Sequence, residues 1–154
     1  MKQARIAALI LGVIAATTLG ASGLGVANQA TIKEMMGENF AGLQTILTAL
    51  VTSNYETVPA HVDLIREHAA QLTRMAPDNE KANRDKFLTY AYNLQGHAAD
   101  VKSIVEVLIE RDKTRAGAEE LATDQLREAL AAHYGGMVTM CVACHNRFRP
   151  RLVK

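Results

Sequence analysis

The chain has 154 residues, of which 49% are apolar and 21% charged, with no tryptophan and a formal net charge of +1. This length is enough for one domain and short for two domains with separate cores, and the composition is that of a helix-rich globular protein rather than a disordered one. The 17 basic and 16 acidic residues give no basic excess, so we expect no binding to nucleic acid.

Residues 1–27 have the pattern of a secretory signal peptide. Lys2 and Arg5 precede a long apolar run, and small residues follow as far as Ala27, a plausible cleavage site. The apolar run is also long enough to span a bilayer, so a retained membrane anchor is the alternative. In both cases we expect the domain, residues 28–154, to lie in a bacterial periplasm. Its 15 basic and 16 acidic residues give it a charge of −1.

The next two predicted elements are amphipathic helices. Residues 29–51 repeat apolar side chains at three- and four-residue spacing, which predicts a buried stripe of Ile32, Met36, Phe40, Leu43, Leu47 and Leu50. The sequence TSNYETVPA interrupts this pattern. The second stripe comprises Val58, Val62, Ile65, Ala69 and Leu72. This helix is expected to end near Pro77, because proline cannot continue a helix.

Two further helices follow. The third starts near Lys81 and extends to the sequence ERDK; its stripe comprises Phe87, Ala91, Leu94, Ala98, Val101, Val105 and Leu108. After a polar link that contains Gly117, the fourth runs from about Ala118 to Phe148 and is expected to stop at Pro150. Its stripe comprises Leu126, Leu130, His133 or Tyr134, Met137 and Cys141. No segment alternates with period two, so we predict an all-α fold, an antiparallel up-and-down four-helix bundle.

The sequence MCVACHNRF, residues 140–148, holds the only two cysteines of the chain. Cys141 and Cys144 are three residues apart, so on a helix they share one face. Two thiols on one face can reach the two vinyl groups on one edge of a haem and form thioethers. His145 follows directly, where its imidazole can ligate the iron. This C-x-x-C-H pattern is a signature of c-type haem attachment, so we predict one covalent haem c.

Three other interpretations of the two cysteines are less favourable. A structural zinc site needs four ligands and usually two such cysteine pairs, whereas this chain has one pair and histidines scattered over three predicted helices. A thioredoxin-like dithiol belongs at a helix N-terminus after a strand, and no strand precedes this pair. A disulfide between residues i and i+3 of a helix is geometrically poor.

A signal peptide followed by four helices, with C-x-x-C-H close to the C-terminus, resembles the class II c-type cytochromes, which comprise cytochrome c′ and its low-spin relatives of the cytochrome c556 type. The resemblance spans residues 28–154, and its specific part is local: Tyr134 and Gly135 before the motif and HNRFR at its end. It implies a homodimer formed through the first two helices. It also implies the roles of four residues: thioethers at Cys141 and Cys144, the proximal iron ligand at His145 and a haem-edge position for Arg149.

The distal side departs from the family pattern. The family's first helix supplies the residue over the sixth iron position from a stretch resembling R-Q-x-x-M/L-K-x-x-G, and here residues 29–37 are QATIKEMMG. One alignment places Lys33 over the iron; another places Ile32 there and leaves the iron five-coordinate. Met36 and Met35 are the methionine candidates, with Met36 ahead because it lies on the apolar stripe. A methionine on such a stripe usually packs in the core, and this interpretation stays open as well.

We therefore expect a carrier that exchanges single electrons with periplasmic redox partner proteins through its haem iron. A methionine as sixth ligand would raise the reduction potential. The alternative is a five-coordinate cytochrome c′ that binds nitric oxide or carbon monoxide at an open distal site. The sequence holds no Ser-His-Asp order, carboxylate dyad or glycine-rich phosphate loop, so we do not expect an enzyme.

Overall fold

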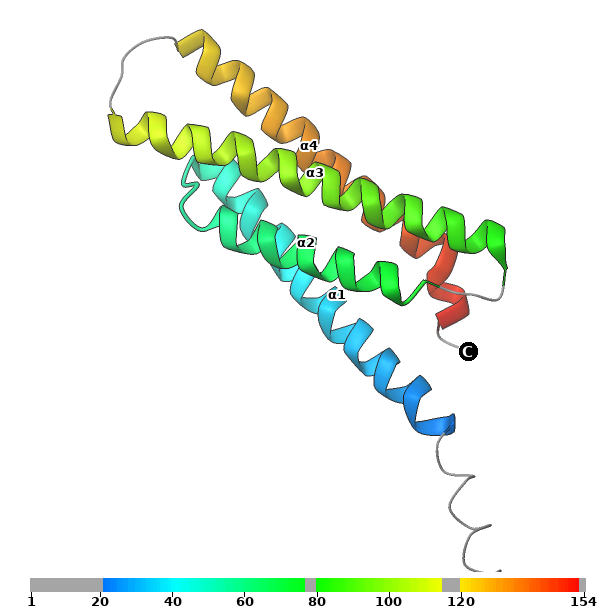
Figure 1. The fold of residues 1–154 in the computed structure, drawn as a ribbon. Coiled ribbons are helices and arrows are strands. Elements are labelled where there is room, and N and C mark those ends of the chain that lie inside the picture. Colours follow the sequence, from blue (N-terminus) through cyan, green and yellow to red (C-terminus); the bar gives the residue numbers. More distant parts are fainter. Residues whose placement is uncertain (1–20, 77–79, 115–119, 153–154) are drawn as a thin grey trace, which may run out of the picture. The chain divides into compact units, whose positions relative to one another are not determined.

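A computed structural model describes residues 21–76, 80–114 and 120–152, and the side chains of residues 31–76, 80–114 and 122–148. These residues form four α-helices and no strand, which confirms the predicted all-α class (Figure 1). The helices are α1 (Ala21–Thr52), α2 (Val58–Arg74), α3 (Lys81–Thr114) and α4 (Glu120–Leu152). Pro77 and Gly117, which the sequence places in links between helices, lie outside the described residues.

The chain divides into two units, Met1–Met35 and Met36–Lys154, and α1 contributes to both. The second unit is a four-helix bundle made of the C-terminal part of α1 and the whole of α2, α3 and α4. Within it α3 lies between α2 and α4, and these three helices alternate in direction (Figure 1). Such alternation follows from the few residues between consecutive helices, because a short link allows the next helix only to return alongside the previous one.

The predicted signal peptide falls mostly outside the described residues. Residues 1–20 are not described, and Ala21 begins α1, earlier than the helix start expected at residue 29. None of the helices, as far as they are described, combines the length and the apolar content that a membrane crossing requires. The boundary between signal peptide and domain at residue 28 stays a prediction.

A capped turn joins α1 to α2. Ser53 has a φ of 53°, and the N–H of Asn54 donates to the carbonyl oxygen of Ala49 at 3.1 Å. This left-handed residue with a 6→1 hydrogen bond is a Schellman-type ending, which satisfies a carbonyl of the last turn. Tyr55 in the turn is buried, and Pro59 lies in the first turn of α2, where its missing N–H costs no helical bond.

The stripes predicted for α2 and α3 are confirmed, because every residue assigned to them is buried. They meet residues of α1 and α4 in one core, whose largest fully buried side chains are Ile46, Ile65, Leu108, Leu130 and Met137. Each such side chain contributes about 1.5–3 kcal/mol when it leaves water, and this burial holds the bundle together.

The stripe predicted for α1 is wrong by about one residue. Phe40 and Leu47, expected in the core, are 63% and 47% exposed, whereas Ile46 and Ala49 are buried. Leu43 and Leu50 are partly buried and pack at the edge of the core, as expected. A shift of one residue turns a helix by about 100°, so a different face of α1 is buried.

Small and polar residues explain which face of α1 is buried. A methyl group on Gly42 would lie 3.4 Å from Cδ1 of Ile65, so α1 and α2 approach closely at this glycine. One turn earlier, the buried Asn39 forms a hydrogen bond with His68 of α2, which offsets the cost of burying its amide. A pattern of large apolar residues does not reveal this face, because three of its buried residues, Asn39, Gly42 and Ala49, are small or polar.

The C-terminus of α4 is a second correction. The helix was expected to stop at Pro150, but it continues to Leu152. Proline removes one backbone donor, and because α4 ends two residues later, the loss is confined to its last turn.

Two neighbouring residues of α1 test its register. Ile46→Ala is expected to lower the free energy of unfolding by about 2–5 kcal/mol, because the side chain is fully buried. Leu47→Ala is expected to cost less than about 1 kcal/mol, since half of that side chain already meets water. Urea unfolding of the two variants beside the unaltered protein measures both. A larger loss for Leu47→Ala would contradict the register described here.

Candidate functional site

A small cavity of about 40 Å³ lies within the second unit, and all four helices contribute to its wall. The residues that line it are Met36, Asn39, Leu72, Phe87, Tyr90, Ala91, Leu94, Met140, Cys141, Cys144 and His145. The cysteines and the histidine of the C-x-x-C-H motif thus share one largely apolar cavity with Met36, the favoured distal candidate. Met36 lies more than a hundred residues from the motif in the sequence.

The motif lies inside α4, so both thiols and the imidazole are carried by continuous helix. Cys141 and Cys144 are partly buried free thiols, and His145 is exposed at the edge of the cavity. Nε2 of His145 lies 3.4 Å from Sδ of Met36, although the two residues are 109 positions apart. The imidazole and the thioether, the two side chains proposed as axial ligands, are therefore in contact with each other at the wall of the cavity.

The environment of the thiols differs from that of a redox-active dithiol. Burial raises the pKa of the Cys141 thiol, and it raises the pKa of the Cys144 thiol to about 11, with a further contribution from the charge of Cys141. Reactive thiols have a lowered pKa and so form thiolate at neutral pH. The pKa of both thiols is shifted in the opposite direction, which weighs against the dithiol interpretation.

The donor set matches a covalent haem in kind. Two thiols on one helical face can carry thioethers, an imidazole and a thioether sulfur are standard axial ligands, and the lining is apolar. The structure leaves no gap for a porphyrin between the two proposed axial ligands, since Nε2 of His145 and Sδ of Met36 are in contact at 3.4 Å. A bound haem therefore requires Met36 and His145 to move apart. Both can do so, because His145 is exposed and methionine has three rotatable side-chain bonds.

An aromatic cluster anchors the end of α4 beside the cavity. The ring of Phe148, one turn after His145, meets the ring of Phe87 edge-on with centroids 5.3 Å apart, and Tyr90 lies at 6.4 Å. Edge-to-face pairs at these distances are favourable beyond their buried area. Since Phe87 and Tyr90 also line the cavity, the cluster fixes the turn that carries His145 against α3.

Arg147 is exposed but makes two specific contacts, one with α3 and one with its neighbour Phe148. Its Nη2 donates a hydrogen bond of 3.2 Å to Oδ1 of Asn83, which is buried at the start of α3. Its guanidinium also lies over the ring of Phe148. Arg147 thus adds a polar link between α4 and α3 next to the aromatic cluster.

A buried polar group that the sequence pattern does not reveal adjoins the cavity. Nδ1 of His68 lies 2.8 Å from Oδ1 of Asn39, and because an amide oxygen only accepts, Nδ1 carries the proton. Nε2 of the same ring lies 3.3 Å from Oε2 of Glu38. These two contacts of His68 connect α2 to α1 beside the cavity. The available clue was a histidine within the apolar stripe of α2, between Ile65 and Ala69.

The other residues named from the sequence have mixed outcomes. Ile32, Lys33 and Met35 belong to the first unit, so Met36 alone among the distal candidates shares a unit with the cavity. The side chain of Arg149 lies outside the described part of the structure. Tyr134, one of the residues that carry the family resemblance, donates a hydrogen bond of 3.2 Å to the carbonyl oxygen of Leu43 and so links α4 to α1.

Loss of the Phe148 ring tests the anchoring of α4. Phe148→Ala is expected to lower the free energy of unfolding by about 3–5 kcal/mol, because it leaves a cavity among packed rings. Tyr92→Ala is the matched control on α3, where an aromatic side chain is 58% exposed, and it is expected to cost less than about 1 kcal/mol. Urea unfolding compares the two, and similar losses would show that the cluster does not hold α4.

Comparison with known proteins adds no relative to this description. No protein-family model, curated protein sequence or solved structure matches the chain. The chemistry of the site therefore follows from its own residues: two thiols and an imidazole on α4, a thioether on α1 and an apolar wall between them.

Proposed function

We propose that this protein is a periplasmic c-type cytochrome, of the class II kind that its sequence resembles, and that it transfers single electrons. The observation that carries the proposal is the convergence of Cys141, Cys144 and His145 with Met36 on one apolar cavity. The C-x-x-C-H sequence by itself indicates haem attachment. The cavity adds an apolar surround and a second ligand type on the opposite helix.

Each residue has a distinct part in the proposal. Cys141 and Cys144 hold the haem through thioethers, and the S–H of each thiol adds across one vinyl group without any oxidant. His145 of α4 would hold the iron as the proximal ligand, and Met36 of α1 would hold it as the distal ligand. When bound, the haem supplies one-electron chemistry, because its iron alternates between the ferric and ferrous states.

The apolar wall and the Met36 ligand act in the same direction in this proposal. Leu72, Phe87 and Leu94 keep water from the iron and lower the local dielectric, which disfavours the extra charge of the ferric state. A methionine ligand acts in the same direction and raises the reduction potential. Met36 also fills the sixth position, and its contact with His145 favours electron transfer over binding of nitric oxide or carbon monoxide at an open site.

The proposed compartment rests on the first 27 residues. Their basic start, apolar run and small residues near Ala27 are typical of an exported protein. Export is consistent with electron transfer, because an exported electron carrier exchanges its electron with other proteins of the same compartment. We therefore propose that redox partner proteins deliver and accept the electron at the edge of the haem.

Absorption spectroscopy tests the proposal. The protein, produced in cells that attach haem c, is oxidised, reduced and reoxidised while its spectrum is recorded. The expected result is a haem spectrum that changes reversibly, with a potential dependence that fits the transfer of one electron. Absence of haem absorption would refute the proposal, and a haem that cannot be reduced reversibly would refute its electron-transfer part.

A further inference from the structure

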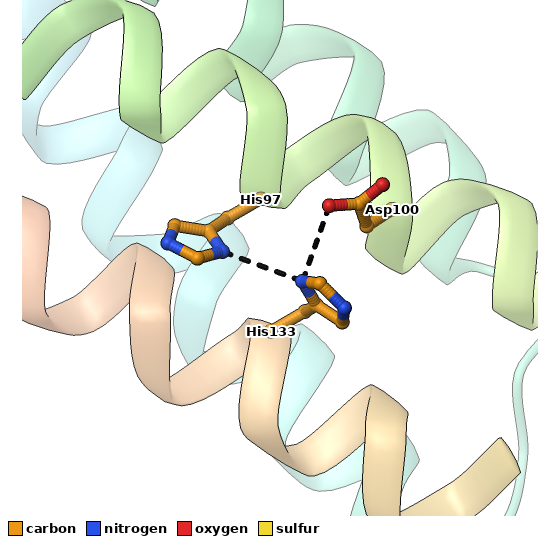
Figure 2. A group of neighbouring side chains, drawn as sticks. All are labelled: His97, Asp100 and His133. Atoms are coloured by element: carbon orange, nitrogen blue, oxygen red, sulfur yellow. Dashed lines mark hydrogen bonds and ion pairs between the residues drawn. The ribbon is translucent and has the colours of Figure 1, made fainter.

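Three side chains with metal-ligating atoms converge between α3 and α4, and none of them lines the cavity. His97 and Asp100 extend from α3, and His133 extends from α4 to meet them (Figure 2). Nδ1 of His97 lies 3.3 Å from Nδ1 of His133, and the latter atom lies 3.2 Å from Oδ2 of Asp100. The three ligand atoms all lie within 4.8 Å of one another.

These distances match the spacing of ligands around one metal ion. Two ligand atoms that each lie 2.0–2.1 Å from a tetrahedral zinc ion are about 3.3–3.4 Å apart. Two of the three atom pairs in this cluster already have that separation. The third pair, from His97 to Asp100, lies within the 4.8 Å that bounds the cluster, and the Asp100 side chain is exposed.

One nitrogen at the centre of the cluster has two neighbours and one position for a proton. Nδ1 of His133 carries at most one proton, yet it faces both the imidazole nitrogen of His97 and the carboxylate of Asp100. If this proton is donated to the Asp100 carboxylate, the His97 nitrogen can share it only through a bifurcated hydrogen bond. A single cation accepts electron pairs from two imidazoles and a carboxylate together, so it satisfies all three groups.

The backbone of α4 makes room for the His97 ring. A Cβ atom built on Gly136 would lie 2.5–2.7 Å from three atoms of that imidazole, which is closer than Cβ atoms approach other atoms in protein structures. Gly136 lies three residues after His133, on the same side of α4. The helix thus supplies one ligand and, one turn later, the gap in which the other imidazole packs.

We propose that His97, Asp100 and His133 bind a divalent cation of the zinc type and thereby connect α3 to α4. Two imidazoles and one carboxylate form a recognised three-residue zinc set, in which water completes the tetrahedron. Magnesium and calcium prefer oxygen ligands throughout, so they fit this set poorly. The site shares no residue with the C-x-x-C-H motif and does not depend on the function proposed above.

Zinc titration tests the site. The protein is purified without a histidine tag from cells that attach haem c, and zinc chloride is added in a calorimeter. We expect one site that His133→Ala removes and that Asp100→Asn weakens at least tenfold. Asp100→Asn is expected to fold normally, since the side chain is 55% exposed. Asp85→Asn, an exposed aspartate of α3, and His61→Ala of α2 are the matched controls and are expected to bind zinc as the unaltered protein does.

A second measurement covers variants that fold poorly. Zinc at a hundredfold excess over its dissociation constant is expected to raise the thermal midpoint of the unaltered protein by about 5 °C, and that of Asp100→Asn by much less. If the thiols carry no haem, Cys141, Cys144 and His145 bind zinc equally in all variants, so the difference between variants is unaffected. The proposal fails if the unaltered protein takes up no zinc, or if His133→Ala and Asp100→Asn both bind it unchanged.

Discussion

Combining Cys141→Ala with Cys144→Ala is expected to abolish the haem stain of the protein on a denaturing gel. Only haem joined through thioethers remains with an unfolded chain, and these are the only two cysteines available. Either single variant retains one thioether at most, so we expect its stain to be weaker than that of the unaltered protein. The two thiols lie on one face of α4 and line the same cavity, which is why the loss should require both.

Val142→Ala is the matched control for the cysteine variants. It alters the interior of the motif at a side chain that is 52% exposed, without removing a thiol or the imidazole. Its stain should equal that of the unaltered protein. A stained band in the double cysteine variant would show that the haem is held elsewhere, and a loss of stain in Val142→Ala would show that the helix, rather than the thiols, determines attachment.

Met36→Ala is expected to open the sixth position of the iron. In the unaltered protein the Met36 sulfur lies opposite Nε2 of His145, so we expect the ferrous protein to show little spectral change when carbon monoxide is added. In the variant, alanine does not reach the iron, and carbon monoxide should bind at once. The reduction potential of the variant should also be lower than that of the unaltered protein, because axial ligands shift haem potentials over a range of about 0.8 V.

Met35→Ala controls for a general loosening of α1. It removes the same number of atoms from the adjacent residue, which on a helix points about 100° away. Its spectrum and its response to carbon monoxide should be those of the unaltered protein. Complete and immediate carbon monoxide binding by the unaltered protein would contradict methionine ligation and would favour the five-coordinate, gas-binding alternative.

The buried faces of α2 and α3 could be predicted because apolar side chains make up most of them, with His68 and Asn83 as the buried polar exceptions. In α3, apolar residues recur every three or four positions from Phe87 to Leu108, and all of those predicted to be buried are buried. The buried face of α1 could not be predicted in this way. Asn39 is buried because His68 supplies a hydrogen bond from another helix, and Gly42 faces α2 because it allows a close approach. Neither residue contributes to an apolar pattern.

The two sites differ in how far the sequence reveals them. Cys141, Cys144 and His145 are neighbours in the chain, so their spacing alone is informative. His97 and His133 are 36 residues apart on different helices, and no spacing indicates that they meet. Met36 is intermediate: the apolar pattern selected it as a candidate, but only the packing of α1 against α4 brings it to His145.

The intact mass of the exported protein under denaturing conditions shows whether Cys141 and Cys144 carry a covalent haem. Wherever the N-terminus lies, the unaltered protein should exceed the double cysteine variant by the mass of one haem, after allowance for the two sulfur atoms removed. A difference of two sulfur atoms alone would contradict covalent haem attachment at Cys141 and Cys144, and with it the proposed function.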